Sequence, residues 1–269
     1  MTRPVVHDGE HQSVPRPRPS FLTLPVRTPR PRMDGISHVL DNGLSLVETQ
    51  HRLESAGAAV DVWKFGWGTA YLDPALHDKL DLLSAHGVRA CTGGTLLEIS
   101  WLQGATAPFM DWAQASGFDC IEVSCGSVTM PRDVKSAIIA EAAERFVVLA
   151  EVGTKDPQVA VSADQWADDA AADIAAGATW VVTEGRDSGT VGMFESDGSV
   201  RTEIVDTLVE RVGLERLLFE APLKSQQAWL IRRFGANVNL GNINPFEALS
   251  VEALRLGLRS DTIGNEERP

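Results

Sequence analysis

The chain has 269 residues, 43% of them hydrophobic and 23% charged, with a net charge of −13 at pH 7. A length close to the roughly 250 residues of one α/β barrel predicts a single globular domain rather than two small ones or a disordered protein. The acidic balance argues against a nucleic-acid partner, because such proteins gather Lys and Arg to displace counterions.

Neither a membrane segment nor a disulfide framework is indicated. No apolar run reaches the roughly 18 residues that span a bilayer, and no charged-then-apolar leader opens the chain. The three cysteines, Cys91, Cys120 and Cys125, lack CxxC spacing, which indicates free thiols. We therefore expect a cytoplasmic protein with no membrane partner.

Residues 1–33 differ in composition from the rest of the chain. They hold six arginines against Asp8 and Glu10, together with repeated prolines. Proline fixes φ and removes a backbone donor, and so little apolar surface cannot offset the entropy of ordering. We predict a disordered or extended Pro/Arg-rich tail over 1–33 and a barrel domain over 34–269. The tail is either solvated without a role or lies on the acidic body or on a neighbouring subunit.

After the tail, short apolar runs alternate with longer runs of helical period, the pattern of repeated βα units. The predicted strands are 38–41, 59–65, 88–91, 119–124, 146–152, 179–184, 217–220 and 237–240. The predicted helices are 44–56, 74–86, 110–115, 132–144, 163–175, 203–212, 226–234 and 245–256. This order predicts an α/β fold of the (β/α)8 TIM-barrel type, although an open doubly wound sheet would alternate similarly.

Polar residues and glycines follow nearly every predicted strand, as in Gly93-Gly94-Thr95. In a barrel all such clusters meet at the C-terminal mouth, where catalytic residues lie. No GxGxxG fingerprint follows the first strand, which disfavours a dinucleotide-binding sheet.

Acidic side chains recur at the strand ends, at Asp41, Glu122, Glu151, Glu184 and Glu220. Several carboxylates at one mouth would repel one another unless a cation neutralised them, and oxygen ligands of this kind suit Mg2+. Each acid could instead cap the following helix or pair with a barrel lysine.

Basic side chains balance this ring, at Lys64, Lys155, Arg186 and Lys224. Such a set predicts a small substrate with two or three negative groups. A desolvated Lys155 could act as an acid or base, could simply pair with a neighbouring Glu, or could form a Schiff base as in aldolases.

Several motifs together resemble the phosphosulfolactate synthase family. They are 64–69 (KFGWGT), 93–95 (GGT), 184–189 (EGRDSG), 219–222 (FEAP) with 224–227 (KSQQ), and 237–243 (NVNLGNI). The likeness extends from about residue 40 to residue 261, nearly the whole barrel. It implies a (β/α)8 barrel, dependence on Mg2+, and addition of sulfite to phosphoenolpyruvate. A plant heat-stress group shares these motifs, so membership does not by itself settle activity.

The resemblance also implies roles for individual residues. Lys155 matches the family's proton donor and acts with Lys64, Arg186 and Glu184. Substrate binding falls to Lys64, Arg186, Ser188, Gly189, Lys224, Asn239, Gly241, Asn242, Gly94, Thr95 and Cys125, and metal binding to Glu184, Glu220 and Asp41.

The chain departs from the family pattern at Cys125, where relatives carry Asp, and at Thr154, where they tend to carry a second Lys. We therefore weigh retained sulfite addition against a divergent reaction that adds another nucleophile to phosphoenolpyruvate. A non-catalytic stress-related barrel is a third hypothesis, against which the full set of mouth charges argues. Because barrels often associate through their outer helices, a homo-oligomer is expected.

Overall fold

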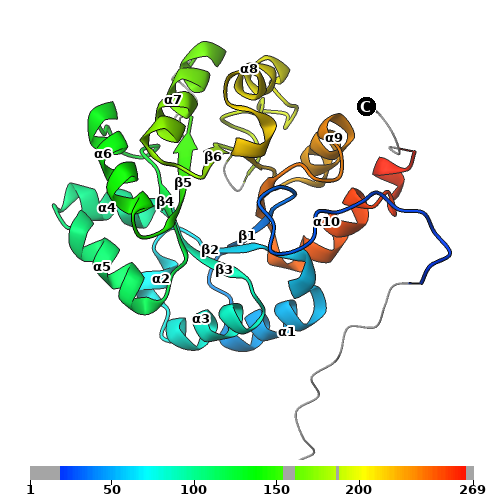
Figure 1. The fold of residues 1–269 in the computed structure, drawn as a ribbon, viewed down its shortest axis with the longest axis horizontal. Helices are drawn as coiled ribbons and strands as arrows, with labels where there is room; N and C mark the ends of the chain where they lie inside the picture. The colour runs from blue at the N-terminus through cyan, green and yellow to red at the C-terminus, as the bar shows by residue number, and fades with distance from the viewer. Residues whose placement is uncertain (1–18, 154–160, 186–187, 265–269) are drawn as a thin grey trace, which may run out of the picture.

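The computed structural model describes residues 19–153, 161–185 and 188–264. Eight parallel strands close into a barrel in chain order, and helices surround it (Figure 1). This confirms the predicted TIM barrel over the doubly wound sheet. The strands are β1 Ser37–Asp41, β2 Val62–Phe65, β3 Arg89–Thr92, β4 Cys120–Val123, β5 Val147–Val152, β6 Trp180–Thr183, β7 Leu217–Glu220 and β8 Leu240–Ile243.

The helical layer contains α1 Leu46–Ala56, α2 Thr69–Leu72, α3 Leu76–Ala85, α4 Gly94–Leu102, α5 Thr106–Ser116, α6 Arg132–Ala143, α7 Ala163–Ala176, α8 Thr202–Val212, α9 Lys224–Phe234 and α10 Ala248–Arg255. Short 3-10 turns are η1 Gly57–Ala59, η2 Leu214–Arg216, η3 Pro245–Glu247 and η4 Ser260–Thr262. Capping boxes begin α1 at Ser45 and α7 at Ser162. Among the described residues, the helices are too short or too polar to cross a bilayer.

Side chains at alternate strand positions fill the barrel interior. One apolar layer comprises Ile36, Val62, Cys91, Cys120, Leu149, Trp180 and Leu218, and Val182 packs against it from the next inward position of β6; all are buried. Since the side-chain period of a strand is two, the next inward position lies one layer closer to the C-terminal mouth. Those positions carry Lys64, Glu122, Glu151 and Glu220, so the apolar layer forms the floor of a charged cavity.

The N-terminal strap, residues 25–34, lies against the opposite end of the barrel, beside α10 (Figure 1). Arg32 and Arg30 both pair with Asp61, which precedes β2, and Arg27 pairs with Glu252 of α10. Residues 25–34 therefore lie on the acidic body, one of the alternatives predicted for the tail, because these arginines find buried acidic partners there. Residues 1–18 lie outside the described part of the chain.

Candidate functional site

A cavity of about 340 Å3 opens at the C-terminal mouth of the barrel. Its lining residues come from all eight strand ends and the segments after them, namely Leu40, Lys64, Trp67, Gly94, Thr95, Glu122, Ser127, Glu151, Glu184, Glu220 and Asn242. The structure thus brings together the predicted site residues Lys64, Gly94, Thr95, Glu184, Glu220 and Asn242.

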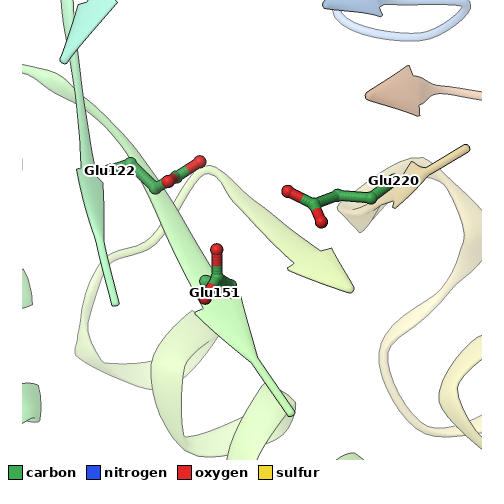
Figure 2. A group of neighbouring side chains, drawn as sticks. All are labelled: Glu122, Glu151 and Glu220. Carbon is green, nitrogen blue, oxygen red and sulfur yellow. The ribbon is translucent and has the colours of Figure 1, made fainter. Parts of the chain in front are cut away.

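Three buried carboxylates form the centre of this cavity. Oxygens of Glu122, Glu151 and Glu220 all lie within 4.8 Å of one another, and Figure 2 shows the three side chains converging from their strands. Glu122 and Glu151 were recognised as strand-end acids but not chosen as metal ligands. Their strand parity could have identified them, because each lies two positions after an inward-facing apolar residue.

Lys64 joins two of these carboxylates. Its ammonium donates to Glu122 at 2.8 Å and to Glu220 at 3.3 Å, and the side chain is buried. Burial alone would lower the pKa of Lys64, but the neighbouring carboxylates outweigh burial and raise it. Lys64 is therefore held as a cation, suited to gripping an anion and unsuited to attack as a neutral amine.

The pKa of Glu220 is raised to about 7. Burial is the largest cause; Lys64 opposes the shift, whereas Glu151 and Glu122 reinforce it. Its second oxygen accepts from the backbone N–H of Gly185 at 2.9 Å.

The β3–α4 junction approaches the cavity so closely that only glycine fits. Gly94 opens α4 and donates its N–H to Glu122 at 3.0 Å. A Cβ on Gly94 would lie 2.4 Å from the Ser124 hydroxyl, and one on Gly93 would lie 2.5 Å from the backbone nitrogen of Trp67. Helix α4, which starts directly at the glycine pair, is absent from the helices predicted from the sequence.

Asp41 does not point into the cavity. It is one residue out of phase with the lining residue Leu40, and its oxygens accept from Trp63 Nε1 at 3.0 Å and from the N–H groups of Gly43 and Leu44. The structure therefore does not bring Asp41 together with the other predicted metal ligands, and its carboxylate organises the β1–α1 connection.

Asn239 is also placed away from the mouth. Strand β8 begins at Leu240, three residues later than the predicted 237, so Asn239 precedes it. Its amide accepts from Ile36 N–H at 2.9 Å and donates to Leu217 O at 2.9 Å, at the N-terminal ends of β7 and β8. This is a structural link between strands, and the structure does not bring Asn239 to the cavity where a substrate role was predicted. Gly241 lies inside β8, where a Cβ would approach Leu218 to 2.4 Å.

Other predicted substrate residues are described but are not among the cavity's lining residues. Lys224 is half-exposed and pairs with Asp261 at 3.1 Å. Ser188 shares a hydrogen bond with Thr190, and the Gly189 carbonyl accepts from Gln226 at 2.7 Å. Cys125 is partly buried, and burial raises the pKa of its thiol. Lys155, Arg186 and the departure at Thr154 lie outside the described residues.

The chain matches the family model described as (2R)-phospho-3-sulfolactate synthase (ComA) over residues 25–261. It is 41% identical to the phosphosulfolactate synthase of Bacillus subtilis (strain 168), over 90% of this chain and 97% of that protein. The chain belongs to the phosphosulfolactate synthase family. The family member from Methanothermobacter thermautotrophicus (strain ATCC 29096 / DSM 1053 / JCM 10044 / NBRC 100330 / Delta H) is 38% identical, covering 91% of this chain and 96% of its own.

The barrel fold of this family is also found in more distant enzymes. A solved structure of 3-keto-L-gulonate-6-phosphate decarboxylase from Vibrio cholerae O1 biovar El Tor str. N16961 has a TM-score of 0.53 at 15% identity. It covers 81% of this chain and 94% of its own. At that identity the likeness concerns the fold alone.

Proposed function

We propose that this protein adds sulfite to phosphoenolpyruvate to form phosphosulfolactate. The observation that carries the proposal is the pairing of a cationic Lys64 with converging carboxylates at the mouth of a barrel of this family. The sulfur lone pair forms a C–S bond at the methylene carbon, and the π electrons move into the carboxylate as an enediolate. A proton then reaches the carbon bearing the phosphate, which stays attached.

A divalent cation fits the site. Three buried carboxylates outnumber the one lysine among them, and Mg2+ prefers oxygen ligands at about 2.1 Å while keeping several waters. We propose Glu122, Glu151 and Glu220 as its holders, with Glu184 at the same cavity. When bound, the ion would stabilise the negative charge that develops on the substrate carboxylate.

The residues of the chain have distinct tasks in this proposal. Lys64, kept charged by its neighbours, binds an anionic group of phosphoenolpyruvate. The resemblance assigns the proton transfer to Lys155. Burial raises the pKa of the Cys125 thiol, so the thiol stays protonated and uncharged. The presence of Cys125 where relatives carry Asp therefore gives no specific support to a nucleophile other than sulfite. A cytoplasmic location and a homo-oligomeric state stay predictions of the sequence.

A phosphorus NMR time course with phosphoenolpyruvate, sulfite and Mg2+ tests the reaction. We expect a new phosphate-ester signal, and a rate reduced at least about 100-fold for Lys64→Met, because the charged contact with the substrate inside the cavity is lost. Lys224→Met is the matched control, since Lys224 pairs with Asp261 outside the cavity lining, and should stay within a few-fold of the parent. An unchanged phosphoenolpyruvate signal with the parent protein would reject sulfite addition.

A further inference from the structure

Two residues of the cavity wall have an unusual backbone conformation. Trp67 and Asn242 have φ values of 51° and 52°, and within the described segments they are the two non-glycine residues with positive φ. Both line the cavity, from the segment after β2 and from β8. Left-handed backbone is unfavourable for residues with a Cβ and persists where surrounding contacts enforce it, often at functional sites.

The Asn242 side chain carries a buried polar atom, Oδ1, without a partner in the described part of the chain. The side chain is buried and stands between the cavity and a second one of about 340 Å3. A buried amide that the protein leaves unsatisfied in a polar cavity is available to a ligand. Because O and N of an amide can exchange places by rotation, the group can present its NH2 to an anion.

His38 holds the Asn242 backbone from inside the barrel. The N–H of Asn242 donates to His38 Nδ1 at 3.3 Å, and the imidazole is fully buried. The intervening Gly241 leaves room for this contact, because a Cβ there would lie 3.3 Å from Nδ1 and 2.4 Å from Leu218. The ring is thus the packing partner that defines the turn.

The imidazole is neutral and in one tautomer. Burial, reinforced by the charge of Lys64, lowers the pKa of His38 well below its ordinary value. A neutral ring that accepts at Nδ1 carries its proton on Nε2. Nε2 has no hydrogen-bond partner within the described chain, so the contact to Asn242 is the ring's one polar function there.

We propose that His38 is a positioning residue: it accepts the Asn242 backbone N–H and so holds the left-handed turn that presents the Asn242 amide to an oxyanion of the substrate. The identity of that substrate as phosphoenolpyruvate rests on the proposed function. The amide supplies a neutral donor of fixed direction in the same cavity as Lys64, whose charge attracts anions without orienting them.

Three variants separate this role from simple packing. His38→Asn keeps an acceptor near the place of Nδ1, whereas His38→Leu, whose side chain has the same number of heavy atoms and the same branching as Asn, removes it. Asn242→Gly removes the amide and favours the same backbone turn. Binding of phosphoenolpyruvate and of inorganic phosphate would be measured by calorimetry with Mg2+, alongside thermal unfolding. Long-range 1H–15N spectra of the wild-type protein report the His38 tautomer.

We expect the Nε2–H tautomer and near-parental binding by His38→Asn. His38→Leu and Asn242→Gly should each bind about tenfold or more weakly, as for a lost hydrogen bond to a charged group. Asn242→Gly should unfold at the same temperature or higher. Parental affinity in Asn242→Gly, or an Nδ1–H tautomer, would overturn the proposal, and both readouts stand even if His38→Leu does not fold.

Failure of the proposed function gives a different pattern. If phosphoenolpyruvate does not bind but inorganic phosphate does, with the same order of variants, the substrate is wrong and the positioning role holds. If neither anion binds the wild-type protein, both the proposed function and the oxyanion-binding role of Asn242 are rejected.

Discussion

Glu220 links the chemistry of the cavity to the stability of the fold. Its pKa is raised from an ordinary 4.5 to about 7, chiefly by burial. An acid with a raised folded-state pKa binds an extra proton when folded, so its contribution to stability is complete below about pH 4.5. That contribution is lost as pH rises through about 7, and above that pH the ionised group is a cost.

Replacing this carboxylate should therefore stabilise the protein in alkaline solution. We expect Glu220→Gln, in EDTA, to raise the unfolding free energy at pH 8 by on the order of 1–3 kcal/mol, with little change at pH 5. Guanidinium denaturation at both pH values measures the difference. Glu195→Gln serves as the control, because the exposed ion pair of Glu195 with Arg201 contributes little to the unfolding free energy. An equal gain at pH 5 would show that burial of the charge is not the cause.

Single residues also show what the sequence could and could not predict. Strand-end acids were visible at Asp41 and Glu122 alike, but the structure turns the first to the helices and the second into the cavity. Alternation from Leu40 and Cys120 separates the two cases. By contrast, the contact between His38 and Asn242 joins residues 204 positions apart, and no local sequence pattern predicts it.

At the scale of elements, local periodicity predicted the strands well where they are flanked by clear turns. β7 was predicted at its observed bounds, whereas β8 was placed three residues early because 237–240 looks as apolar as its continuation. Helix α4 was missed because its first residue is a glycine. That glycine is required by the approach of Glu122 and Ser124, which is a tertiary constraint.

The N-terminal strap is an element whose placement the sequence left open. Arg32 Nε lies 2.9 and 3.0 Å from the two oxygens of Asp61, which also accepts from the N–H of Ser37 in β1. The Met33 carbonyl accepts from the indole of Trp180, one of the residues that fill the barrel interior. Composition left open whether the tail is solvated or lies on the acidic body, because partners this distant in sequence cannot be read from composition.

Breaking this anchor should destabilise the protein without impairing catalysis. Arg32→Ala leaves Asp61 buried with Arg30 as its one described ion-pair partner, so we expect a loss of about 3 kcal/mol in unfolding free energy. The turnover rate should stay near parental, because the strap lies at the end of the barrel opposite the cavity. Denaturation and the phosphorus NMR rate test both halves. Arg201→Ala breaks an exposed ion pair and should lower the unfolding free energy by less than about 0.5 kcal/mol. If it lowers the unfolding free energy as much as Arg32→Ala does, the strap contributes no more to stability than a surface ion pair.

The whole molecule separates stability from chemistry along the barrel axis. The strap and Asn239 tie the N-terminal end, an apolar layer fills the middle, and charge gathers at the C-terminal mouth. The net charge of −13 repels anionic substrates at long range, so their capture depends on local groups such as Lys64. The same acidic body favours the approach of a divalent cation to the mouth.

A metal held by the carboxylates should couple to folding. A ligand that binds the folded state alone stabilises it by about 2.7 kcal/mol at 100 times its Kd, so Mg2+ should raise the unfolding temperature at constant ionic strength. The rise should be larger at pH 8 than at pH 6, because a proton on Glu220 competes with the ion below its pKa of about 7. Glu122→Gln and Glu151→Gln should lose most of it, whereas Glu48→Gln, at an exposed helix cap, should keep it. If Mg2+ raises the unfolding temperature of Glu151→Gln as much as that of the parent, the ion binds elsewhere. The three carboxylates would then affect the substrate only by keeping Lys64 charged.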